Sequence, residues 1–540
     1  MICVSIGRTR HKMMVAEHAA LAERGAQLVE LRLDYLQRAA ELSRLLPNRP
    51  TPVIVTCRRG SDKGLWAGTE DQRLTLLRAA IVQGVDYVDL EEDTAKAIRR
   101  YGKTKRIVSY HNFDETPQDL EEIHARLAAL DADIVKLATM AQHPADNVRM
   151  LKLVAQSKVP TVGFCMGEMG MISRVLTGRY GAPFTYAAVS KERSLAPGQL
   201  TFEELKLLYR YDSIDSDTEI YGVLADPVAH SMSPLIHNSA FVREKLNKVY
   251  LPLRVPGMML GLSLEAFRWL NIKGYSVTIP HKQAIVELAK SFDGPVQEIG
   301  AANTLFRAED VGPQSAWTAA NTDYHAALET LCQALNEIDG MASADAAATT
   351  PSAESIPSAD GAPAAAAPLE LDQTVVQRAS PLAGRRVLIL GCGGVARAIA
   401  LAVMNAGAAL TVTNRTSARG KELAKDLGCQ FIGWENRGTV YADVLINCTS
   451  VGMHPKVDES PFVENWLREG MLVFDTVYNP EQTLLLKQAR DRGCHAATGV
   501  EMFVRQAARQ YQYFTGRPGP IELMRKVVRR AISHVKVEQD

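Results

Sequence analysis

The stretch RRVLILGCGGVARAIALAVMNAGAALTV, residues 385–412, decides the fold of the C-terminal half of this chain. A predicted strand at Val387–Leu390 runs into a glycine turn and then into a predicted helix at Val395–Met404. The glycines of the turn are Gly391, Gly393 and Gly394. Such a turn places backbone N–H groups and a helix N-terminus against a pyrophosphate. The stretch therefore predicts a Rossmann dinucleotide-binding domain, which we place at residues 384–498.

The next predicted strand ends in TVTNRTSAR, residues 411–419, and this segment discriminates between the two nicotinamide cofactors. Enzymes that use NAD usually place a carboxylate here for the ribose 2′-hydroxyl. This segment has no carboxylate and instead offers Asn414, Arg415, Thr416 and Arg419. Because guanidiniums attract a 2′-phosphate and can bind it in a fork, the sequence predicts NADP(H) over NAD(H).

The first 210 residues repeat a short run rich in β-branched residues followed by an amphipathic stretch. This alternation predicts βαβ units and a buried parallel sheet. The runs are Ile2–Ile6, Val29–Asp34, Val53–Arg58, Tyr87–Glu91, Arg106–Tyr110, Asp133–Leu137, Thr161–Cys165 and Phe184–Val189. Eight units favour a closed (β/α)8 TIM barrel over residues 1–212, and an open doubly wound sheet is the alternative.

The acidic segment Asp212–Asp217 predicts a domain boundary. Further runs indicate a second α/β domain at residues 218–337, which helices at about 500–535 would complete. These runs are Tyr221–Leu224, Val249–Leu253 and Tyr275–Ile279. Residues 338–383 contain an Ala/Pro-rich segment (341–369) without a periodic apolar face, and we expect a disordered insert and linker there.

The composition excludes several classes of function. Sixty-one basic residues balance 61 acidic ones in 540 residues, so bulk attraction to nucleic acid or to an anionic membrane is not expected. No apolar run is long and uninterrupted enough to predict a membrane span. The eight cysteines form no CxxC pair, so the sequence supports neither a zinc ribbon nor a thioredoxin-type redox site. No metal site is predicted. The chain begins with MICVSIGRTR, which leaves no room for a signal peptide, and we expect a cytoplasmic protein.

Polar residues gather where the predicted barrel strands end, and this is where barrel enzymes carry their chemistry. Lys136 lies within the apolar run DIVKLA, where burial favours a neutral amine that can form a Schiff base with a ketone. His111 could move protons at neutral pH, and Arg32, Arg58 and Arg174 could clamp a carboxylate. Alone, the lysine would more often reach solvent and the histidine would belong to the core. Together with the arginines they predict a catalytic site.

With these residues, positions 1 to about 210 resemble type I 3-dehydroquinate dehydratase. The matching motifs, in order, are ELRLDYL (30–36), VDLE (88–91), SYHNF (109–113), IVKLA (134–138), MGEMGMISR (166–174) and APGQ (196–199). The resemblance implies that Lys136 forms an imine with 3-dehydroquinate, that His111 transfers the protons, and that Glu91 orients His111. It also implies that the substrate is bound by Ser5, Glu30, Arg32, Arg58, Arg174 and Gln199.

The loop before APGQ departs from the family. The family usually has Ser immediately before this motif, whereas this chain has Leu195 there and Ser194 one residue earlier. Either Ser194 substitutes through a shifted loop, or one substrate contact is lost. The second alternative would weaken affinity without changing the reaction.

Three further motifs follow residue 218: HSMSP (230–234), YSVTIPHK (275–282) and NTD (321–323). Lys282 and Asp323 could exchange protons with a substrate hydroxyl during hydride transfer. Taken singly, the serines of HSMSP could simply cap a helix, and Lys282 and Asp323 could be charged side chains exposed to solvent.

These motifs and the glycine turn resemble shikimate dehydrogenase across residues 218–540. Additional matches are AANT (301–304), NCTSVGM (447–453), DTVYNP (475–480) and GVEMFVRQ (499–506). The resemblance implies that Lys282 and Asp323 are the catalytic pair. It assigns shikimate to Ser231, Ser233, Thr278, Asn303, Tyr478 and Gln506, and the nucleotide to Gly391, Gly393, Gly394, Asn414, Arg415, Thr416, Arg419, Thr449, Thr476 and Gly499.

Ser276, Tyr324 and the domain order are similar to the plant bifunctional enzymes. The sequence therefore predicts dehydration of 3-dehydroquinate followed by NADPH-dependent reduction of 3-dehydroshikimate to shikimate, with small molecules as the only predicted partners. Two alternatives are a regulatory protein that has lost catalysis and a dehydrogenase that prefers quinate. Retention of both lysines disfavours the first, and the serine pair disfavours the second. The fusion of two enzymes indicates neither an oligomeric state nor transfer of the intermediate between sites.

Overall fold

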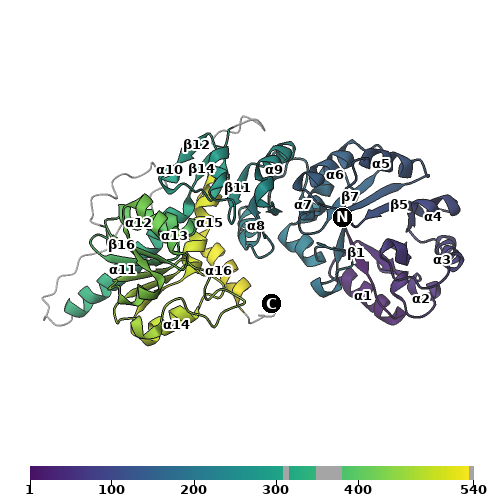
Figure 1. Cartoon of the computed structure of the whole chain (residues 1–540). Helices are drawn as coiled ribbons and strands as arrows, with labels where there is room; N and C mark the ends of the chain where they lie inside the picture. Colours follow the sequence, from purple (N-terminus) through teal and green to yellow (C-terminus); the bar gives the residue numbers. More distant parts are fainter. Residues whose placement is uncertain (308–315, 348–379, 534–540) are drawn as a thin grey trace, which may run out of the picture. The chain divides into compact units, whose positions relative to one another are not determined.

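The structure, a computed structural model, describes residues 1–307, 316–347 and 380–533 (Figure 1). It divides into two compact units. The first contains Met1–His281 with Phe306–Trp317, and the second contains Lys282–Leu305 with Thr318–Asp540. The first unit thus joins the predicted barrel to the first part of the predicted substrate domain, and the acidic segment 212–217 lies inside it.

Eight parallel strands form the barrel, in the order β7-β6-β5-β4-β3-β2-β1-β8, which confirms the predicted fold class. They are β1 (Ile2–Ile6), β2 (Leu28–Arg32), β3 (Val53–Thr56), β4 (Tyr87–Glu91), β5 (Lys105–Asn112), β6 (Ile134–Met140), β7 (Thr161–Met166) and β8 (Thr185–Ala188). Both faces of these strands are largely buried, as their β-branched composition predicts. The register sets polar residues side by side, with Ser5 beside Glu30 and Ser109 beside Lys136.

Helices connect the strands and cover the outside of the barrel (Figure 1). They are α1 (His11–Glu23), α2 (Leu42–Leu45), α3 (Glu70–Val82), α4 (Glu92–Ala97), α5 (Leu120–Ala128), α6 (Pro144–Gln156) and α7 (Met171–Leu176). Local sequence fixes where they begin. Thr69 and Gln72 form a capping box at the start of α3, and Pro144 occupies the first turn of α6, where its missing N–H is not needed.

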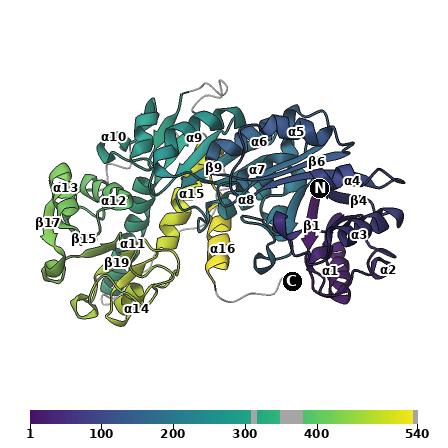
Figure 2. The ribbon, with the colours of Figure 1, turned by 45° about the vertical axis from the view of Figure 1, so that its right-hand side comes forward.

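The first unit continues into a lobe built on three parallel strands, with β9 (Glu219–Ala225) between β10 (Lys248–Arg254) and β11 (Gly274–Val277). Its helices are α8 (Ser233–Arg243) and α9 (Leu260–Phe267). Helix α9 packs against α6 of the barrel, and β10 packs against α7 (Figure 2). At this junction the rings of Tyr180 and Trp269 stack with centroids 4.7 Å apart.

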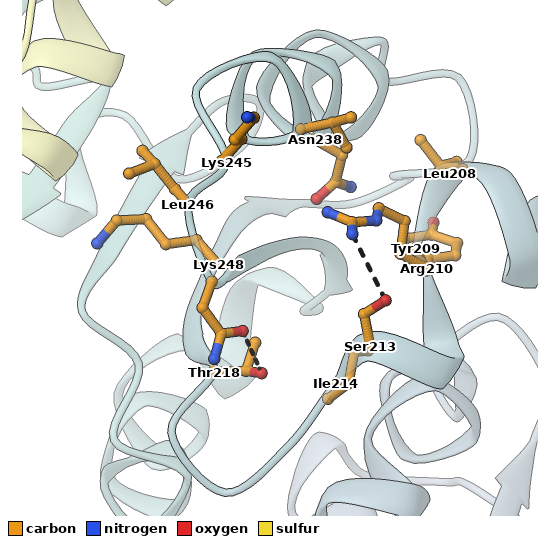
Figure 3. A pocket seen from close by; sticks show the side chains of 12 residues that line it. Leu208, Tyr209, Arg210, Ser213, Ile214, Thr218, Asn238, Lys245, Leu246 and Lys248 are labelled. Carbon is orange, nitrogen blue, oxygen red and sulfur yellow. Dashed lines mark hydrogen bonds between the residues drawn. The ribbon is translucent and has the colours of Figure 1, made fainter.

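A cavity of about 300 Å³ lies where the last barrel segment meets this lobe (Figure 3). Its lining includes Arg210, Lys245 and Lys248, and the Lys248 ammonium is paired with Glu219. None of the predicted site residues lines this cavity. The chemistry therefore has to be sought elsewhere.

The second unit contains a six-stranded parallel sheet in the order β17-β16-β15-β18-β19-β20, the strand order of the dinucleotide-binding fold. Its strands are β15 (Arg386–Leu390), β16 (Ala409–Asn414), β17 (Gln430–Gly433), β18 (Val444–Asn447), β19 (Leu472–Asp475) and β20 (His495–Ala497). The remaining elements are β12 (Ser291–Asp293), β13 (Thr304–Phe306), β14 (Thr318–Ala320), α10 (Val296–Ile299), α11 (Thr322–Ala347), α12 (Gly394–Asn405), α13 (Ser417–Leu427), α14 (Leu484–Asp491), α15 (Gly499–Thr515) and α16 (Ile521–Ile532).

The predicted disorder over residues 338–383 is wrong at both of its ends. Helix α11 continues through Ala347, because the alanines of this stretch are strong helix formers. At the other end, Leu382 is fully buried in the core of the dinucleotide-binding sheet. Residues 348–379, the rest of the predicted insert, lie outside the described residues. Among the described helices, none is both long and apolar enough to cross a membrane.

Arg73 is an unusual contribution of an outer helix to the barrel. It belongs to α3 and is fully buried, and its guanidinium donates to Glu91 (2.9 Å), to the Cys57 carbonyl (2.8 Å) and to Glu70 (2.6 Å). Removing one partner of a buried ion pair leaves an uncompensated charge, which is strongly destabilising.

We therefore expect Arg73→Met to lower the free energy of unfolding by about 3 kcal/mol. The matched control is Arg100→Met, which removes an exposed arginine paired with Asp131 and Asp133 and should cost less than about 1 kcal/mol. Urea unfolding followed by circular dichroism compares the two variants. An equal decrease in the free energy of unfolding in the two variants would contradict the structural role of Arg73.

Candidate active sites

Lys136 lies inside the barrel, on β6, and only 6% of its side chain is exposed. Its Nζ donates a hydrogen bond to Asp89 Oδ2 at 2.9 Å and lies 3.8 Å from Glu30 Oε1. It also sits 4.1 Å from the centroid of the Tyr186 ring. The amine is therefore held by neighbours on three sides and does not reach solvent, contrary to the simpler interpretation of an isolated lysine.

Asp89 is a central residue of this site that the sequence analysis missed. Burial alone would raise the pKa of Asp89, but Arg58 and Lys136 oppose this and hold it well below its usual range. Arg58 donates to Asp89 at 2.8 Å, and Ser109 donates to it at 2.6 Å. Asp89 stands two residues before Glu91 on β4, and strand alternation, which puts such residues on one face, could have indicated it.

Glu91 was predicted to orient His111. Its carboxylate accepts hydrogen bonds from Arg58 at 2.7 Å, from Arg73 at 2.9 Å and from Thr94 at 3.1 Å. Among the described residues no hydrogen bond joins Glu91 to His111, so this role stays a prediction. In this structure Glu91 holds the arginines that organise the site.

His111 is half-buried at the mouth of the barrel, stacked on Phe113 with ring centroids 6.2 Å apart. Loss of solvent, together with the positive charges of Arg58 and Lys136, holds the pKa of His111 well below its usual value. At neutral pH the imidazole is therefore neutral and can accept a proton.

Arg174 differs from the other arginines of the site. It is 1% exposed, and among the described residues it pairs with no carboxylate. Its Nη2 donates to the Pro197 carbonyl at 3.3 Å, and its Nε has no partner in the structure. Burial lowers the pKa of Arg174 to about 10. A buried, unpaired guanidinium is suited to an anionic group of a ligand.

One pocket collects the predicted substrate residues of the barrel. The predicted residues that line it are Ser5, Glu30, Arg32, Arg58, His111, Lys136, Arg174 and Gln199, whereas Glu91 does not. Asp62, Lys63 and Tyr186 also line it and were not predicted. Leu195 lines the pocket, whereas Ser194 does not and donates instead to the Ala196 carbonyl at 2.8 Å. The Ser194 hydroxyl thus does not replace the serine that the resemblance leads one to expect.

The second candidate site is built around Lys282 and Asp323 in the second unit. Lys282 Nζ donates to Asp323 Oδ2 at 2.6 Å, and the side chains are 12% and 8% exposed. Asp323 stands in the first turn of α11, and its backbone N–H donates to Asn321. Asn303 is fixed by Thr322, whose N–H and hydroxyl it engages. The predicted pair is therefore in contact.

The glycine turn faces this pair. A Cβ at Gly394 would lie 3.4 Å from Cδ of Lys282, so a side chain at this position would contact the lysine. Gly391 has a φ of +103°, and a Cβ there would meet the Cys448 carbonyl at 3.0 Å. Beyond Gly393, by contrast, space is open. The turn therefore has the conformation and the free space that a pyrophosphate needs at the N-terminus of α12.

The remaining predicted nucleotide residues lie at the carboxyl ends of neighbouring strands. Asn414 ends β16, and Arg415 and Arg419 follow it, both exposed and without an ion pair among the described residues. The Thr416 carbonyl accepts from Asn414. Thr449 and Thr476 donate to Asn447, and Gly499 starts α15 against the Thr476 carbonyl, where a Cβ would come within 2.6 Å.

The predicted shikimate residues are divided between the two units. In the first, the Ser233 N–H donates to Ser231 Oγ at 3.3 Å, and Thr278 follows β11. In the second, Tyr478 stacks on Phe503 with centroids 4.3 Å apart, and Gln506 donates to the Phe503 carbonyl. Within each unit these residues lie at loop ends or helix starts, where ligand residues are commonly found.

Four family models match the chain. Residues 2–216 match type I 3-dehydroquinase, and residues 223–305 match the shikimate dehydrogenase substrate binding domain. Residues 373–476 match shikimate/quinate 5-dehydrogenase, and residues 499–529 match the shikimate 5′-dehydrogenase C-terminal domain.

Known proteins are similar over the whole chain or over its C-terminal part. The bifunctional 3-dehydroquinate dehydratase/shikimate dehydrogenase, chloroplastic, of Arabidopsis thaliana is 35% identical over 97% of this chain and 83% of its own length. A shikimate dehydrogenase (NADP(+)) of Moorella thermoacetica is 32% identical over 59% of this chain and 95% of its own. The Thermus thermophilus shikimate 5-dehydrogenase in complex with NADP(H) and shikimate is 28% identical over 58% of this chain and 100% of its own, with a TM-score of 0.45.

The lowered pKa of His111 has a consequence for the pH dependence of the barrel site. Because the neutral imidazole persists below the usual histidine pKa of about 6.5, we expect kcat/KM of the barrel site to stay level as the pH falls through that value. It should decline only at clearly lower pH. Initial rates from about pH 5 to pH 8 measure this profile. A half-maximal value near pH 6.5 would contradict the low pKa.

Proposed function

The chain belongs to the family of bifunctional 3-dehydroquinate dehydratase/shikimate dehydrogenases, and from this premise we propose which residues carry its two reactions. The enzyme dehydrates 3-dehydroquinate and reduces 3-dehydroshikimate to shikimate, two steps of the shikimate pathway. We assign the first reaction to Lys136 and His111 in the barrel, and the second to Lys282 and Asp323.

The observation that carries the first assignment is the position of Lys136, buried beside the ionised Asp89. The neutral amine of Lys136 attacks the ketone carbon, and loss of one water gives an imine. The imine acidifies the neighbouring C–H, whose proton passes to His111. The hydroxyl one carbon further on then leaves as water, with a proton from His111. Hydrolysis of the imine consumes one water and releases 3-dehydroshikimate and free Lys136.

Asp89 is suited to position this amine and to balance the positive charge of the protonated imine that forms on it. It lies at hydrogen-bond distance from Lys136 Nζ, and Arg58 keeps it ionised. Arg174 is suited to the substrate carboxylate, because it is buried without a carboxylate partner among the described residues. Leu195 offers no hydroxyl to the substrate, so we propose that this contact is absent here.

For the second reaction we propose that Lys282 protonates the ketone oxygen; its Nζ donates a hydrogen bond to Asp323 at 2.6 Å. NADPH, when bound, supplies the hydride. We propose that Ser231, Ser233, Thr278, Asn303, Tyr478 and Gln506 bind the substrate. The glycine turn would hold the pyrophosphate, with Thr449, Thr476 and Gly499 nearby.

We further propose that Arg415 and Arg419 select NADPH by binding the 2′-phosphate. Both guanidiniums are exposed and have no ion pair among the described residues, and no carboxylate stands in the segment 411–419. The name of the Moorella relative, which specifies NADP(+), agrees with this proposal. That the enzyme needs no metal and works in the cytoplasm are predictions from the sequence. They stand beside the chloroplastic location in the Arabidopsis relative's name.

The decisive experiment gives the protein 3-dehydroquinate and NADPH together and follows both NADPH oxidation and shikimate. We expect shikimate to form in step with NADPH loss. Lys136→Ala should abolish the dehydration and retain reduction of added 3-dehydroshikimate. Lys282→Ala should retain the dehydration and lower the rate of 3-dehydroshikimate reduction by at least about a hundredfold.

Borohydride, which reduces an imine to a stable amine, adds a covalent test. With substrate present it should add one substrate-derived mass to the wild type and none to Lys136→Ala. Dehydration that survives in Lys136→Ala would overturn the imine mechanism.

The cofactor proposal is tested by removing the guanidiniums. Arg415→Ala and Arg419→Ala should each raise the KM for NADPH about tenfold and leave the KM for NADH unchanged, because a charge-assisted hydrogen bond contributes about 1.5–3 kcal/mol. The control is Arg386→Ala, at the opposite end of the sheet, where β15 begins. An equal rise in the KM for NADPH and in the KM for NADH would refute the assignment of Arg415 and Arg419 to the 2′-phosphate.

A further inference from the structure

Glu168 lies in the loop between β7 and α7, at the mouth of the dehydratase pocket, yet it does not line that pocket. Its carboxylate turns instead toward the reductase lobe of the same compact unit. Oε2 lies 3.1 Å from Nη1 of Arg254, and Oε1 accepts a hydrogen bond from the backbone N–H of Val228 at 3.3 Å. A side chain of one enzyme therefore contacts the backbone of the other.

On the lobe side this contact leads directly to predicted substrate residues. Val228 belongs to the loop between β9 and α8, and its carbonyl accepts from the Ser231 N–H at 3.0 Å. The Ser233 N–H in turn donates to Ser231 Oγ at 3.3 Å. Arg254 closes the loop from the other side through its 2.9 Å contact with Asp226. Displacing Glu168 would therefore shift the peptide that positions Ser231.

On the barrel side the contact leads to Arg174. The N–H of Gly167, the residue before Glu168, donates to the Pro197 carbonyl at 3.1 Å. The same carbonyl accepts from Arg174 at 3.3 Å. A substrate carboxylate that engaged Arg174 would therefore compete with this shared acceptor for the guanidinium.

The Glu168–Arg254 pair is not important for stability as such. The two side chains are 24% and 38% exposed, and pairs of this kind contribute little to folding. What sets Glu168 apart is its place in a series of hydrogen bonds and short covalent links that runs from Arg174 to Ser231, both of them predicted substrate residues. Such a series can transmit a change in position between two sites.

From these contacts we propose that Glu168 is a positioning residue that couples the two active sites. This inference rests on the proposed function of both sites. A ligand on Lys136 orders the loop at the barrel mouth, and Glu168 then holds the Val228 loop in the geometry that binds shikimate. Preorganisation of this kind tightens binding, so occupancy of the dehydratase pocket lowers the KM for shikimate. Linkage requires the reverse effect on binding as well.

The test locks the dehydratase pocket in its occupied state. Borohydride treatment of the full-length enzyme with 3-dehydroshikimate reduces the imine on Lys136, which leaves the ligand covalently bound. After desalting, mass spectrometry counts the adduct. The NADP-dependent oxidation of shikimate then gives KM and kcat for the trapped and untrapped enzyme. In the wild type we expect trapping to lower the KM about fivefold and to leave kcat unchanged.

Variants separate positioning from a general structural effect. Glu168→Ala should carry the adduct but show the same KM with and without it. Glu168→Gln keeps an acceptor for the Val228 N–H and should retain part of the decrease in KM for shikimate that trapping causes. The matched control is Glu92→Ala. Among the described residues, Glu92 pairs with Lys96 and Arg126, both in the barrel. Trapping should lower the KM for shikimate in this variant as fully as in the wild type.

The outcomes are distinguishable. The coupling would be overturned if trapping lowered the KM for shikimate fully in Glu168→Ala, or did not lower it in a wild type that carries the adduct. Either result would leave the proposed function intact. A wild type that forms no adduct, or that does not oxidise shikimate, would overturn the proposed function and the coupling with it.

Discussion

The buried contact between Asp89 and Lys136 is the constraint on which the barrel site depends. An amine that must attack a ketone has to be kept out of water, and a buried charge has to be balanced. Asp89 provides this balance, but it is itself buried, and Arg58 on its other side together with Lys136 keeps its pKa low. Glu91 then holds Arg58, and Arg73 holds Glu91 from an outer helix. Lys136, the proposed reacting amine, is thus the innermost member of a series of charged groups that alternate in sign.

Charge balance also distinguishes the residues that hold the protein together from those that await a ligand. Arg58 and Arg73 have their carboxylates in place, whereas Arg174, Arg415 and Arg419 have none among the described residues. Arg174 lines the dehydratase pocket, so its buried guanidinium without a carboxylate indicates where an anionic group of the substrate belongs. This separation supports the assignment of substrate carboxylate and cofactor phosphate more directly than the motifs alone.

Much of the fold follows from local sequence, and the differences have physical reasons. The eight barrel strands lie within two or three residues of the β-branched runs, because both faces of such strands are buried. The pocket contains every substrate residue predicted for the barrel, since parallel strands bring their carboxyl ends together. Asp89 shares a strand face with Glu91 and could have been identified by alternation, whereas Tyr186 meets Lys136 across the lumen, which no local motif reveals. The Ala-rich segment after residue 338 was assigned to disorder on composition, although alanine equally favours a helix.

Helix α11 begins at Thr322, one residue before the proposed catalytic Asp323, and runs without interruption for 26 residues. At 1.5 Å per residue its length is about 39 Å, so the C-terminal end of the helix lies far from Asp323 at its N-terminal end. Sequence added after Ala347 therefore enters at a remote point. A fluorescent label or an affinity tag attached at the end of α11 would therefore lie about 39 Å from Asp323 along the helix.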